Sequence, residues 1–395
     1  MEPQLIEPGD AAGIAAKLKW ANGQGLALTV RGAGTKQSWA DSDSHADAVL
    51  STLGLNAPVD HVAGDLVATV PAGASLDAVN DVLRRERQWL PLDPGGSRLA
   101  TIGGIVATND SGPRRHRYGT PRDLIIGIEI ALADGRIARA GGRVVKNVAG
   151  YDLSKLLCGS LGSLAVITSA TFKLSPLPQA SSTLVASTGD ARRIGTLALA
   201  LSASPLTPST IELQSPPHRL LIRFETSPRA TELQIAAAAS LCAGQGIATE
   251  ILTGQAEADA WRAHEQHVSS GSGTVVKLAV LPTDVGEMAA FAEAEALGHR
   301  LQFAAIGRAA LGIILMRLDG DPSAQATVIA ALRREAASRG GSAVLQSAPH
   351  DIRARVGTWG PAGTSAGPIM RAVKARFDPR GLLNRGREPW ESGPR

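Results

Sequence analysis

The sequence of residues 90–123 limits the possible folds more than any other stretch. It reads LPLDPGGSRLATIGGIVATNDSGPRRHRYGTPRD, which is dense in Gly, Pro, Ser and Asn and has almost no helical or strand periodicity. An irregular segment of this length is uncommon inside a compact domain unless it carries function. We therefore expect a long functional loop here, held between regular elements.

A glycine loop nearer the N-terminus is a second candidate site. GLALTVRGAGTKQSW (25–39) reads as a short strand that runs into RGAGTK (31–36). Consecutive backbone N–H groups in such a turn can bind an anion. The Walker motif needs a longer gap before its Gly-Lys pair, and the dinucleotide fingerprint needs a glycine where Gln37 stands. The loop is therefore a candidate phosphate site of some other fold.

Composition narrows the class of protein. Apolar residues make up 44% and charged residues 19% of the 395 residues, as in an ordinary globular protein. The formal charge of +4 is spread along the chain and aromatic residues are only 3%, which argues against a nucleic-acid-binding surface. Cys158 and Cys242 stand far apart, which predicts neither a disulfide framework nor a metal cluster.

No targeting segment is evident. The start, MEPQLIEPGD, is acidic and lacks an apolar core, and the apolar run AALGIILM is too short to span a bilayer. We therefore expect a cytoplasmic protein, or one that is peripheral at the inner membrane through its partners.

Local signals in the first half predict mixed helices and strands. Asp10 can cap a first helix that stops near Gly25, and Ser75 can cap a second. Residues 124–142 read as a hairpin with its turn at 133–136, and a helix, a glycine break and a strand follow over 153–174. Prolines 176 and 178 suggest a domain boundary near residue 178.

The second half alternates strands and helices without a clear internal sequence repeat. The pattern suggests two βαβ-type units in an α+β domain. GPAGTSAGP (360–368) then reads as a link to a short final helix. The domains we expect are 1–178, 179–359 and 360–395.

Four segments together resemble the FAD-binding flavoproteins of the vanillyl-alcohol oxidase fold, also called the PCMH type. They are RGAGTK, ATIGGIVATNDSGPRRHRYGTPRDLIIGIEIALADGRI, KNVAGYDLSKLLCGSLGSLAVIT and VKARFDPRGLLNRGR, in this order. KNVAGYDLSKLL and the modest length look most like the FAD-binding E subunit of glycolate oxidase. The resemblance is close over residues 1–178 and the last thirty or so. It implies an α+β protein with a two-part FAD-binding domain, an α+β cap domain, and a C-terminal helix that returns to the FAD domain.

The resemblance also implies which residues meet FAD. The glycine loop would wrap the diphosphate, the 90–123 segment would run along the flavin and adenosine, and a third segment would meet the adenine or ribose. The residues that these roles fall on are Arg31, Gly32, Ala33, Gly34, Thr35, Lys36, Pro94, Thr101, Ile102, Gly103, Gly104, Thr108, Asn109, Ser111, Gly112, Tyr118, Gly119, Gly159, Gly162 and Ile167. Ala33 replaces a frequent family glycine, so we expect a negative or mildly strained φ there. Arg122 and Asp123 suit a structural ion pair at least as well as a cofactor role.

Two departures from the family pattern shape the expected chemistry. Some members attach FAD through a histidine in the first glycine loop, where this chain has Thr35, so we expect dissociable FAD. Relatives that oxidise D-2-hydroxy acids carry a histidine-rich stretch in the cap that implies a metal and a base. RLQFAAIGRAALGIIL has none of those histidines, His299 reads as a solvated loop residue, and His264 and His267 lack a third ligand. We expect no metal.

The catalytic residues stay unidentified from sequence. Arg115 and Arg117, in the basic cluster of residues 114–117, could meet a phosphate, a substrate carboxylate or an acidic partner, or simply be solvated. Lys146 could lie near the flavin, where positive charge favours its reduced anion, or on the surface.

The function that we expect is therefore the one that the family resemblance implies. The chain would be a flavin subunit that helps convert glycolate, a small 2-hydroxy acid, to glyoxylate. It would work beside a second FAD-binding subunit and an iron–sulfur subunit. The two rivals are a self-sufficient FAD oxidoreductase for another hydroxy acid or alcohol, and a structural subunit that keeps the fold without redox chemistry.

Overall fold

The computed structural model describes residues 4–40, 46–95, 99–143, 152–271, 273–360 and 366–388. The chain forms two compact units. The first unit draws on Met1–Gly112, Tyr118–Leu177 and Ala362–Glu391, and the second on Pro113–Arg117 and Pro178–Pro361. The first unit is thus built from both ends of the sequence, with the second unit inserted between them.

The elements of the first unit are mostly short. Its strands are β1 (Gln4–Ile6), β2 (Leu28–Arg31), β3 (Ala48–Ser51), β4 (Asp60–Val62), β5 (Val67–Pro71), β6 (Gln88–Trp89), β7 (Ile125–Ala131), β8 (Ile137–Gly141), β9 (Val166–Lys173) and β10 (Ser175–Pro176). Its helices are α1 (Ala11–Gln24), α2 (Leu76–Leu83), α3 (Ile102–Thr108), α5 (Pro121–Leu124), α6 (Leu153–Leu157) and α13 (Gly367–Phe377). The short helix α4 (Arg115–Tyr118) has its first three residues in the second unit and Tyr118 in the first.

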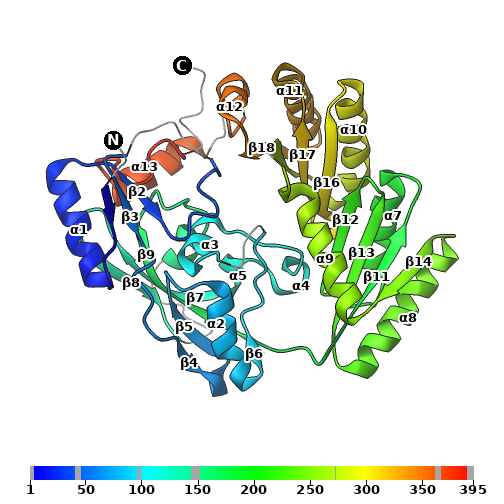
Figure 1. Ribbon diagram of the computed structural model, residues 1–395, viewed down its shortest axis with the longest axis horizontal. Coiled ribbons are helices and arrows are strands. Elements are labelled where there is room, and N and C mark those ends of the chain that lie inside the picture. The colour runs from blue at the N-terminus through cyan, green and yellow to red at the C-terminus, as the bar shows by residue number, and fades with distance from the viewer. Residues whose placement is uncertain are drawn as a thin grey trace. The chain divides into compact units, whose positions relative to one another are not determined.

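Two sheets make up most of the first unit (Figure 1). A three-stranded sheet has the order β1-β3-β2, with both pairs parallel, and a five-stranded antiparallel sheet has the order β4-β5-β9-β7-β8.

Local signals in the sequence determine where several of these elements begin and end. The Asp10 carboxylate caps α1 by accepting from Gly13 N at 2.7 Å, and Ser75 Oγ caps α2 by accepting from Ala78 N at 3.2 Å. The predicted hairpin is present as β7 and β8.

The predicted long loop at 90–123 contains a helix that the sequence reading missed. Ile102, Ile105 and Val106 are buried on one face of α3. Gly103 and Gly104 interrupt the apolar residues of this stretch, so the helical periodicity is not evident in the sequence. Gly103 is needed because a Cβ there would lie 3.0 Å from the Ala72 side chain, so α3 packs flush against the chain that follows β5. The segment is therefore partly helical and closely packed.

The C-terminal segment returns to the first unit, as predicted. The Leu28 N–H donates to Leu382 O at 2.8 Å, and the Asn384 N–H donates to Leu28 O at 3.0 Å. Leu382 and Leu383 are buried, and Phe377 of α13 packs against the same hydrophobic core. The segment therefore adds backbone pairing to the free edge of β2.

The second unit has one eight-stranded antiparallel sheet in the order β14-β11-β13-β12-β16-β17-β15-β18. Its strands are β11 (Ala180–Ser187), β12 (Thr210–Ser215), β13 (Arg219–Thr226), β14 (Ala248–Leu252), β15 (Thr274–Ala279), β16 (Gln302–Arg308), β17 (Ile313–Asp319) and β18 (Ser342–Ser347). Its helices are α7 (Ala191–Ser202), α8 (Pro228–Gly244), α9 (Gly254–Ser269), α10 (Val285–Gly298), α11 (Pro322–Ser338) and α12 (His350–Val356).

This sheet is a structural duplication. The elements β11-α7-β12-β13-α8-β14 form one βαββαβ module, and β15-α10-β16-β17-α11-β18 form another with the same strand arrangement. The modules join edge to edge through β12 and β16, where Glu212 pairs with Arg308. The expected βαβ-type units are thus present as two complete modules, although no repeat was visible in the sequence.

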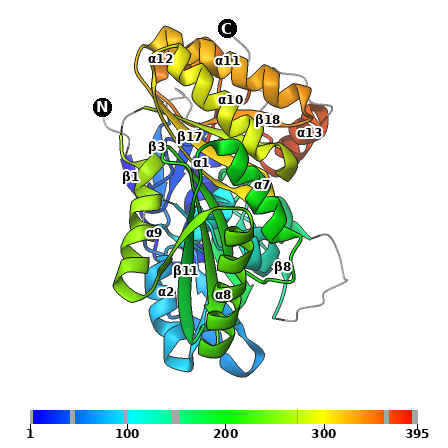
Figure 2. The same cartoon turned by 90° about the vertical axis from the view of Figure 1, so that its right-hand side faces the viewer.

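The two faces of the sheet differ. Helices α7, α8, α10 and α11 cover one face, and α9 lies on the other (Figures 1 and 2). The helix-covered face buries a continuous apolar core that includes Leu184, Leu213, Ile222 and Met316. The α9 face carries polar and charged side chains instead. Across the residues that the structure describes, no helix is both long and apolar enough to cross a membrane.

Candidate cofactor site

A groove in the first unit brings together segments that are far apart in the sequence. Its walls are the glycine loop after β2, the first turns of α3, the Leu161–Gly162 turn with the start of β9, and the C-terminal residues Asn384 and Arg387. The groove holds about 650 Å³ of space, counting the part that is open to solvent.

Many residues of the groove lining are ones for which the resemblance implies an FAD contact. The predicted residues that line it are Gly32, Ala33, Gly34, Thr35, Lys36, Thr101, Gly103, Gly104, Thr108, Gly162 and Ile167. The structure therefore collects residues from all three predicted segments into one concave surface.

The other predicted residues lie outside the lining. Arg31 is exposed at the end of β2, and Ile102 is buried in the core. Gly112 packs on Asp93, since a Cβ there would lie 2.0 Å from Asp93 O. The Tyr118 ring meets Trp89 edge-on, with ring centroids 5.7 Å apart.

The remaining members of this set have local structural roles or simply flank the groove. Asn109 ends α3 with φ 48°, and its Oδ1 accepts from Arg122 N at 3.2 Å. Gly119 has φ +82°, and a Cβ there would lie 2.7 Å from Asp123 Cβ. The Asp123 carboxylate accepts from Thr120 N at 2.7 Å, so it caps α5. Pro94, Ser111 and Gly159 also lie beyond the lining.

Close approach explains two glycines of the loop after β2. A Cβ on Gly32 would lie 2.1 Å from Thr101 Oγ1, so only glycine lets this loop pack against the start of α3. Gly34 has φ +77°, which L-residues with side chains rarely adopt. Ala33 is not among the residues with positive φ, as expected for a side chain at that position.

Lys36 forms a buried ion pair with Asp110. Its ammonium lies 2.8 Å from Asp110 Oδ2 and donates to Gly95 O at 3.0 Å, and its side chain is only 6% exposed. Trp39 lies beneath it, with the ring centroid 5.3 Å from Nζ. The lysine therefore ties the glycine loop to the segment after α3, and Asp110 balances its charge.

The sequence reading missed the contribution of the C-terminal segment to the groove. Asn384 Oδ1 accepts from Val30 N at 2.8 Å, and its Nδ2 donates to Leu161 O at 2.7 Å. Arg387 Nη2 donates to Gln37 O at 3.0 Å and to Gln37 Oε1 at 2.6 Å. In the sequence, these two polar residues stand in the stretch LLNRGR (382–387). Val30, Gln37, Thr52, Ala107, Leu161 and Ala165 also line the groove without having been predicted.

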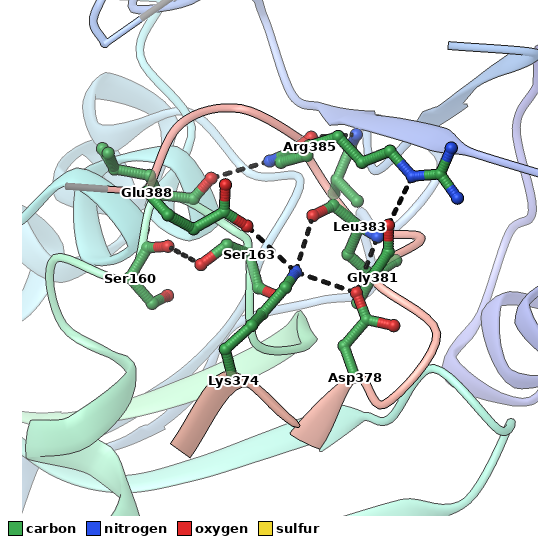
Figure 3. A network of polar contacts seen from close by, with 11 residues as sticks. Ser160, Ser163, Lys374, Asp378, Gly381, Leu383, Arg385 and Glu388 are labelled. Atoms are coloured by element: carbon green, nitrogen blue, oxygen red, sulfur yellow. Dashed lines mark hydrogen bonds and ion pairs between the residues drawn. The ribbon is translucent and has the colours of Figure 1, made fainter. Parts of the chain in front are cut away.

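A buried lysine network holds the C-terminal segment in place (Figure 3). The Lys374 ammonium donates to Ser163 O at 2.7 Å, to Leu383 O at 3.1 Å and to Asp378 Oδ2 at 2.9 Å, and it lies 3.2 Å from Glu388 Oε1. The Asp378 and Glu388 side chains are 1% and 3% exposed. One ammonium therefore connects α13, the segment after it and the turn before β9.

The basic cluster of residues 114–117 belongs to the second unit. Arg114 makes a two-pronged pair with Glu225, with Nη2 2.8 Å from Oε1 and Nε 3.2 Å from Oε2. Burial alone would raise the pKa of the Glu225 carboxyl, but Arg114 and nearby donors hold that pKa below its ordinary value. Arg117 is exposed and reaches Thr207 O at 3.4 Å. Arg115 lies in the same short helix, whereas Lys146 falls outside the described residues.

His116 differs from its basic neighbours. Its Nδ1 is buried without a hydrogen-bond partner among the described residues. Burial lowers the pKa of this imidazole, and the Glu212 carboxylate offsets part of the shift. The imidazole is therefore held neutral at pH 7.

The polar face under α9 carries an ionic network. His264, 1% exposed, lies 3.2 Å from Glu212 Oε2, and Arg308 Nε lies 3.7 Å from Glu212 Oε1. Toward the other end of α9, Glu257 accepts from Thr183 Oγ1 at 2.7 Å and pairs with Arg223 at 3.1 Å. Thus α9 binds the sheet largely through polar contacts. His267 Nε2 donates to Ser215 O at 3.4 Å. No group of three or more metal-binding side chains occurs within the described ranges.

Comparison with known protein families shows which kind of domain supplies most of the groove wall. Residues 3–141 match the family model described as "FAD binding domain". The N-terminal region is an FAD binding domain. It supplies the glycine loop, Thr101 and α3, which form most of the groove wall.

Curated proteins that this chain resembles include enzymes named for 2-hydroxy acids. D-lactate dehydrogenase of Archaeoglobus fulgidus is 39% identical over 44% of this chain, but that match spans only 38% of its own length. Glycolate oxidase subunit GlcE of Escherichia coli is 43% identical over 30% of this chain and 35% of its own. D-2-hydroxyglutarate dehydrogenase of Xanthomonas citri is 27% identical over 96% of this chain and 88% of its own.

Solved structures agree on the fold. An alkyldihydroxyacetonephosphate synthase is 14% identical and covers 96% of this chain and 76% of its own, with a TM-score of 0.73. At this identity the likeness concerns the fold alone. The chain thus combines an FAD binding domain with an antiparallel-sheet cap domain, as in the vanillyl-alcohol oxidase and PCMH family, and the cap is the second unit.

Proposed function

We propose that this chain is the FAD-binding subunit of a complex that oxidises glycolate, or a closely related small 2-hydroxy acid, and passes the electrons to an iron–sulfur partner. The observation that carries the proposal is the groove, in which the FAD binding domain and the C-terminal segment enclose a concave, glycine-lined surface. The local match to a GlcE subunit supports the choice of complex.

The groove residues suit an extended dinucleotide. Gly104 has only Thr101 Oγ1 within 4 Å of a Cβ position, at 3.3 Å, so one side of α3 presents bare backbone to the groove. Gly34 and its neighbours offer backbone N–H groups at a turn, which suit phosphate oxygens. Thr108 and Thr101 place hydroxyl-bearing side chains along the same wall. When bound, FAD would supply a redox centre that can accept electrons and pass them on.

Glycolate oxidation also needs a base for the hydroxyl proton and a cation for the carboxylate. Arg114, one candidate cation, is paired with Glu225. The stretch 300–315, where the family resemblance implies metal-binding histidines, has none here. His264 is occupied by Glu212 and Gln214. We therefore propose that the partner flavoprotein performs hydride transfer, while this subunit relays electrons or stabilises the complex.

Anaerobic stopped-flow mixing with glycolate tests this assignment. The isolated, FAD-loaded chain should bleach far more slowly than a working enzyme, because loss of a general base costs about 10²–10⁴-fold in rate. The complex purified from cells should bleach rapidly and should contain an iron–sulfur protein and a second flavoprotein. Bleaching of the isolated chain at roughly 1 s⁻¹ or faster would show a complete active site and contradict this division of labour.

A self-sufficient oxidoreductase is the second candidate. The near full-length match to a D-2-hydroxyglutarate dehydrogenase favours it. A panel of 2-hydroxy acids with the isolated chain separates the two, because a self-sufficient enzyme should reduce its flavin with one of them. A visible spectrum without flavin bands, from protein purified in excess FAD, would instead indicate a structural subunit without redox chemistry.

A further inference from the structure

We propose that the C-terminal segment carries a second small-molecule site, separate from the groove, which binds a small α-amino acid by its ammonium and carboxylate groups. A cavity of about 210 Å³ is lined by residues of α13 and of the chain that follows it. None of the residues that line this cavity also lines the groove. The site therefore goes beyond the proposed function and does not depend on it.

The first step concerns two buried carboxylates that line the cavity. The Lys374 ammonium contacts one oxygen of each, Asp378 Oδ2 at 2.9 Å and Glu388 Oε1 at 3.2 Å. Their side chains are 1% and 3% exposed, and the second oxygens, Asp378 Oδ1 and Glu388 Oε2, have no hydrogen-bond partner among the described residues. Figure 3 shows the two carboxylates on different sides of the ammonium. Because a buried acceptor without a donor is costly, these oxygens suit a ligand that brings N–H groups.

The second step concerns charge. Two carboxylates share one ammonium, so this end of the cavity carries one net negative charge. A ligand ammonium would balance that charge, and its three N–H donors can serve both unpartnered oxygens at once. A divalent metal ion fits less well, because it brings one positive charge too many. In addition, no group of three or more metal-binding side chains occurs in the part of the chain that the structure describes.

The third step concerns the group that would bind the ligand carboxylate. Arg371 lines the cavity and precedes Lys374 by three residues, so the two side chains share one face of α13. Arg371 is exposed and forms no hydrogen bond or ion pair among the described residues. Its planar guanidinium can donate two parallel N–H bonds to a carboxylate. Arg385, which donates to Gly381 O, also lines the cavity.

The fourth step concerns space. Ala375 and Gly381 contribute little bulk to the lining, and a Cβ on Gly381 would have no atom within 4 Å. Open space therefore lies among the charged groups. A compact ligand that carries its ammonium and its carboxylate on neighbouring atoms fits this arrangement, and glycine and serine are the simplest examples.

Isothermal titration calorimetry of the purified chain with glycine and L-serine tests the proposal. Both should bind with dissociation constants of roughly 1 mM or below. Acetate lacks the ammonium and methylammonium lacks the carboxylate, so each should bind at least about 10-fold more weakly than glycine. Glycolate, which has a hydroxyl in place of the ammonium, should likewise bind the cavity more weakly.

Four variants locate the binding. Arg371→Met should weaken glycine binding by about 10- to 100-fold, as expected for the loss of a charged hydrogen bond. Glu388→Gln should weaken it as well, because it removes negative charge beside the ligand ammonium. Ala375→Leu should abolish binding by filling the cavity. Arg376→Met is the matched control, because Arg376 is exposed on α13 but does not line the cavity, and it should leave glycine binding unchanged. Urea unfolding checks that each variant is folded.

The possible outcomes are distinct. Absence of glycine and serine binding at about 10 mM would overturn the proposal. Acetate or glycolate that binds as tightly as glycine, and loses this binding in Ala375→Leu, would show that the carboxylates do not select an ammonium. Glycine binding that persists in Ala375→Leu would place the ligand elsewhere and refute the site. A chain that binds glycine but no FAD would contradict the proposed function and leave the amino-acid site standing.

Discussion

The Asn384 side chain lies directly against the backbone of Gly162. A Cβ on Gly162 would come within 2.5 Å of Asn384 Nδ2. That amide is held in place on both sides, by Val30 N and by Leu161 O. A residue near the end of the chain therefore requires glycine at position 162, and this requirement exists whether or not a cofactor is bound.

Gly162→Ala should accordingly destabilise the protein more than Gly159→Ala. Gly162 and Gly159 have positive φ values of +70° and +82°. Alanine in this backbone conformation should therefore lower the free energy of unfolding by a similar amount at both positions, about 1–2 kcal/mol. At Gly159 the nearest atom to a Cβ is Asn109 Cβ at an ordinary 3.6 Å. Displacing Asn384 should cost a further ~1–3 kcal/mol in lost hydrogen bonds. Urea unfolding of the two variants measures the difference, and equal losses would contradict the prediction.

Lys36→Met should destabilise the flavin-free protein by about 3–5 kcal/mol, because it leaves the Asp110 carboxylate uncompensated. The control is Arg84→Met, whose pair with Asp81 is 49% and 72% exposed and should contribute about 1 kcal/mol or less. The double variant Lys36→Met with Asp110→Asn should recover part of the loss. Urea unfolding of all four proteins checks this, and a Lys36→Met loss no greater than that of the control would refute it.

Stability should fall as the pH drops below about 6.5, in part because of His116. Burial holds the pKa of His116 below its ordinary value of 6.5. The unfolded chain therefore takes up the proton first, so this stabilisation is complete above pH 6.5 and is lost as pH falls through the folded pKa. His267, whose pKa burial also lowers, acts in the same direction.

The variant His116→Gln should flatten the decline in unfolding free energy between about pH 7.5 and 5.5, because it removes the imidazole whose pKa burial lowers. Chemical unfolding at a series of pH values provides the measurement. Parallel curves for wild type and His116→Gln would show that His116 titrates normally in the folded state.

FAD should be released intact by acid. Thr35 stands in the loop where some relatives carry a flavin-linked histidine, so we expect non-covalent binding. Acid precipitation should leave a colourless pellet and yellow supernatant. Flavin that stays with the pellet and appears on a peptide after proteolysis would disprove this.

Both thiols should be inert in the folded protein. Cys158 and Cys242 are buried, and burial raises the pKa of Cys158 to about 12. Because the thiolate is the reactive form, a thiol reagent such as DTNB should label neither cysteine at pH 8 until guanidinium is added. Rapid labelling of native protein would contradict this prediction.

Features set by local chemistry were predictable from the sequence. Asp10, Ser75 and the Ala133–Arg136 turn act on residues a few positions away, so their effects can be inferred from short stretches. Helix α3 was not predicted because the reason for glycine at position 103 is its close packing against Ala72, a residue from a different segment of the chain. The two units of the cap were expected, but their duplication was not visible in the sequence because the copies share an arrangement of strands and not a recurring pattern of residues.

The candidate site likewise has some features that the sequence predicts and others that only the fold reveals. Resemblance placed the glycine loop and α3 in the groove, since those segments keep recognisable short motifs. The roles of Lys36, Asn384 and Arg387 depend on partners elsewhere in the chain: Asp110, Val30 and Gln37. Such pairings follow only from the folded arrangement. The resemblance assigns Lys36 to the phosphate loop, and the fold adds that its ammonium pairs with Asp110.

The pairing of Leu28 with residues 382–384 has a consequence for how the protein is made. A ribosome that adds about 5–20 residues per second needs roughly 20–70 s to travel from Leu28 to Leu383. During that interval the outer edge of β2 lacks its final partner, and the duplicated cap module has already emerged. The nascent chain must keep this strand edge from pairing wrongly with other chains. Early FAD capture or a chaperone could supply that protection, so co-factor supply during translation becomes a determinant of yield.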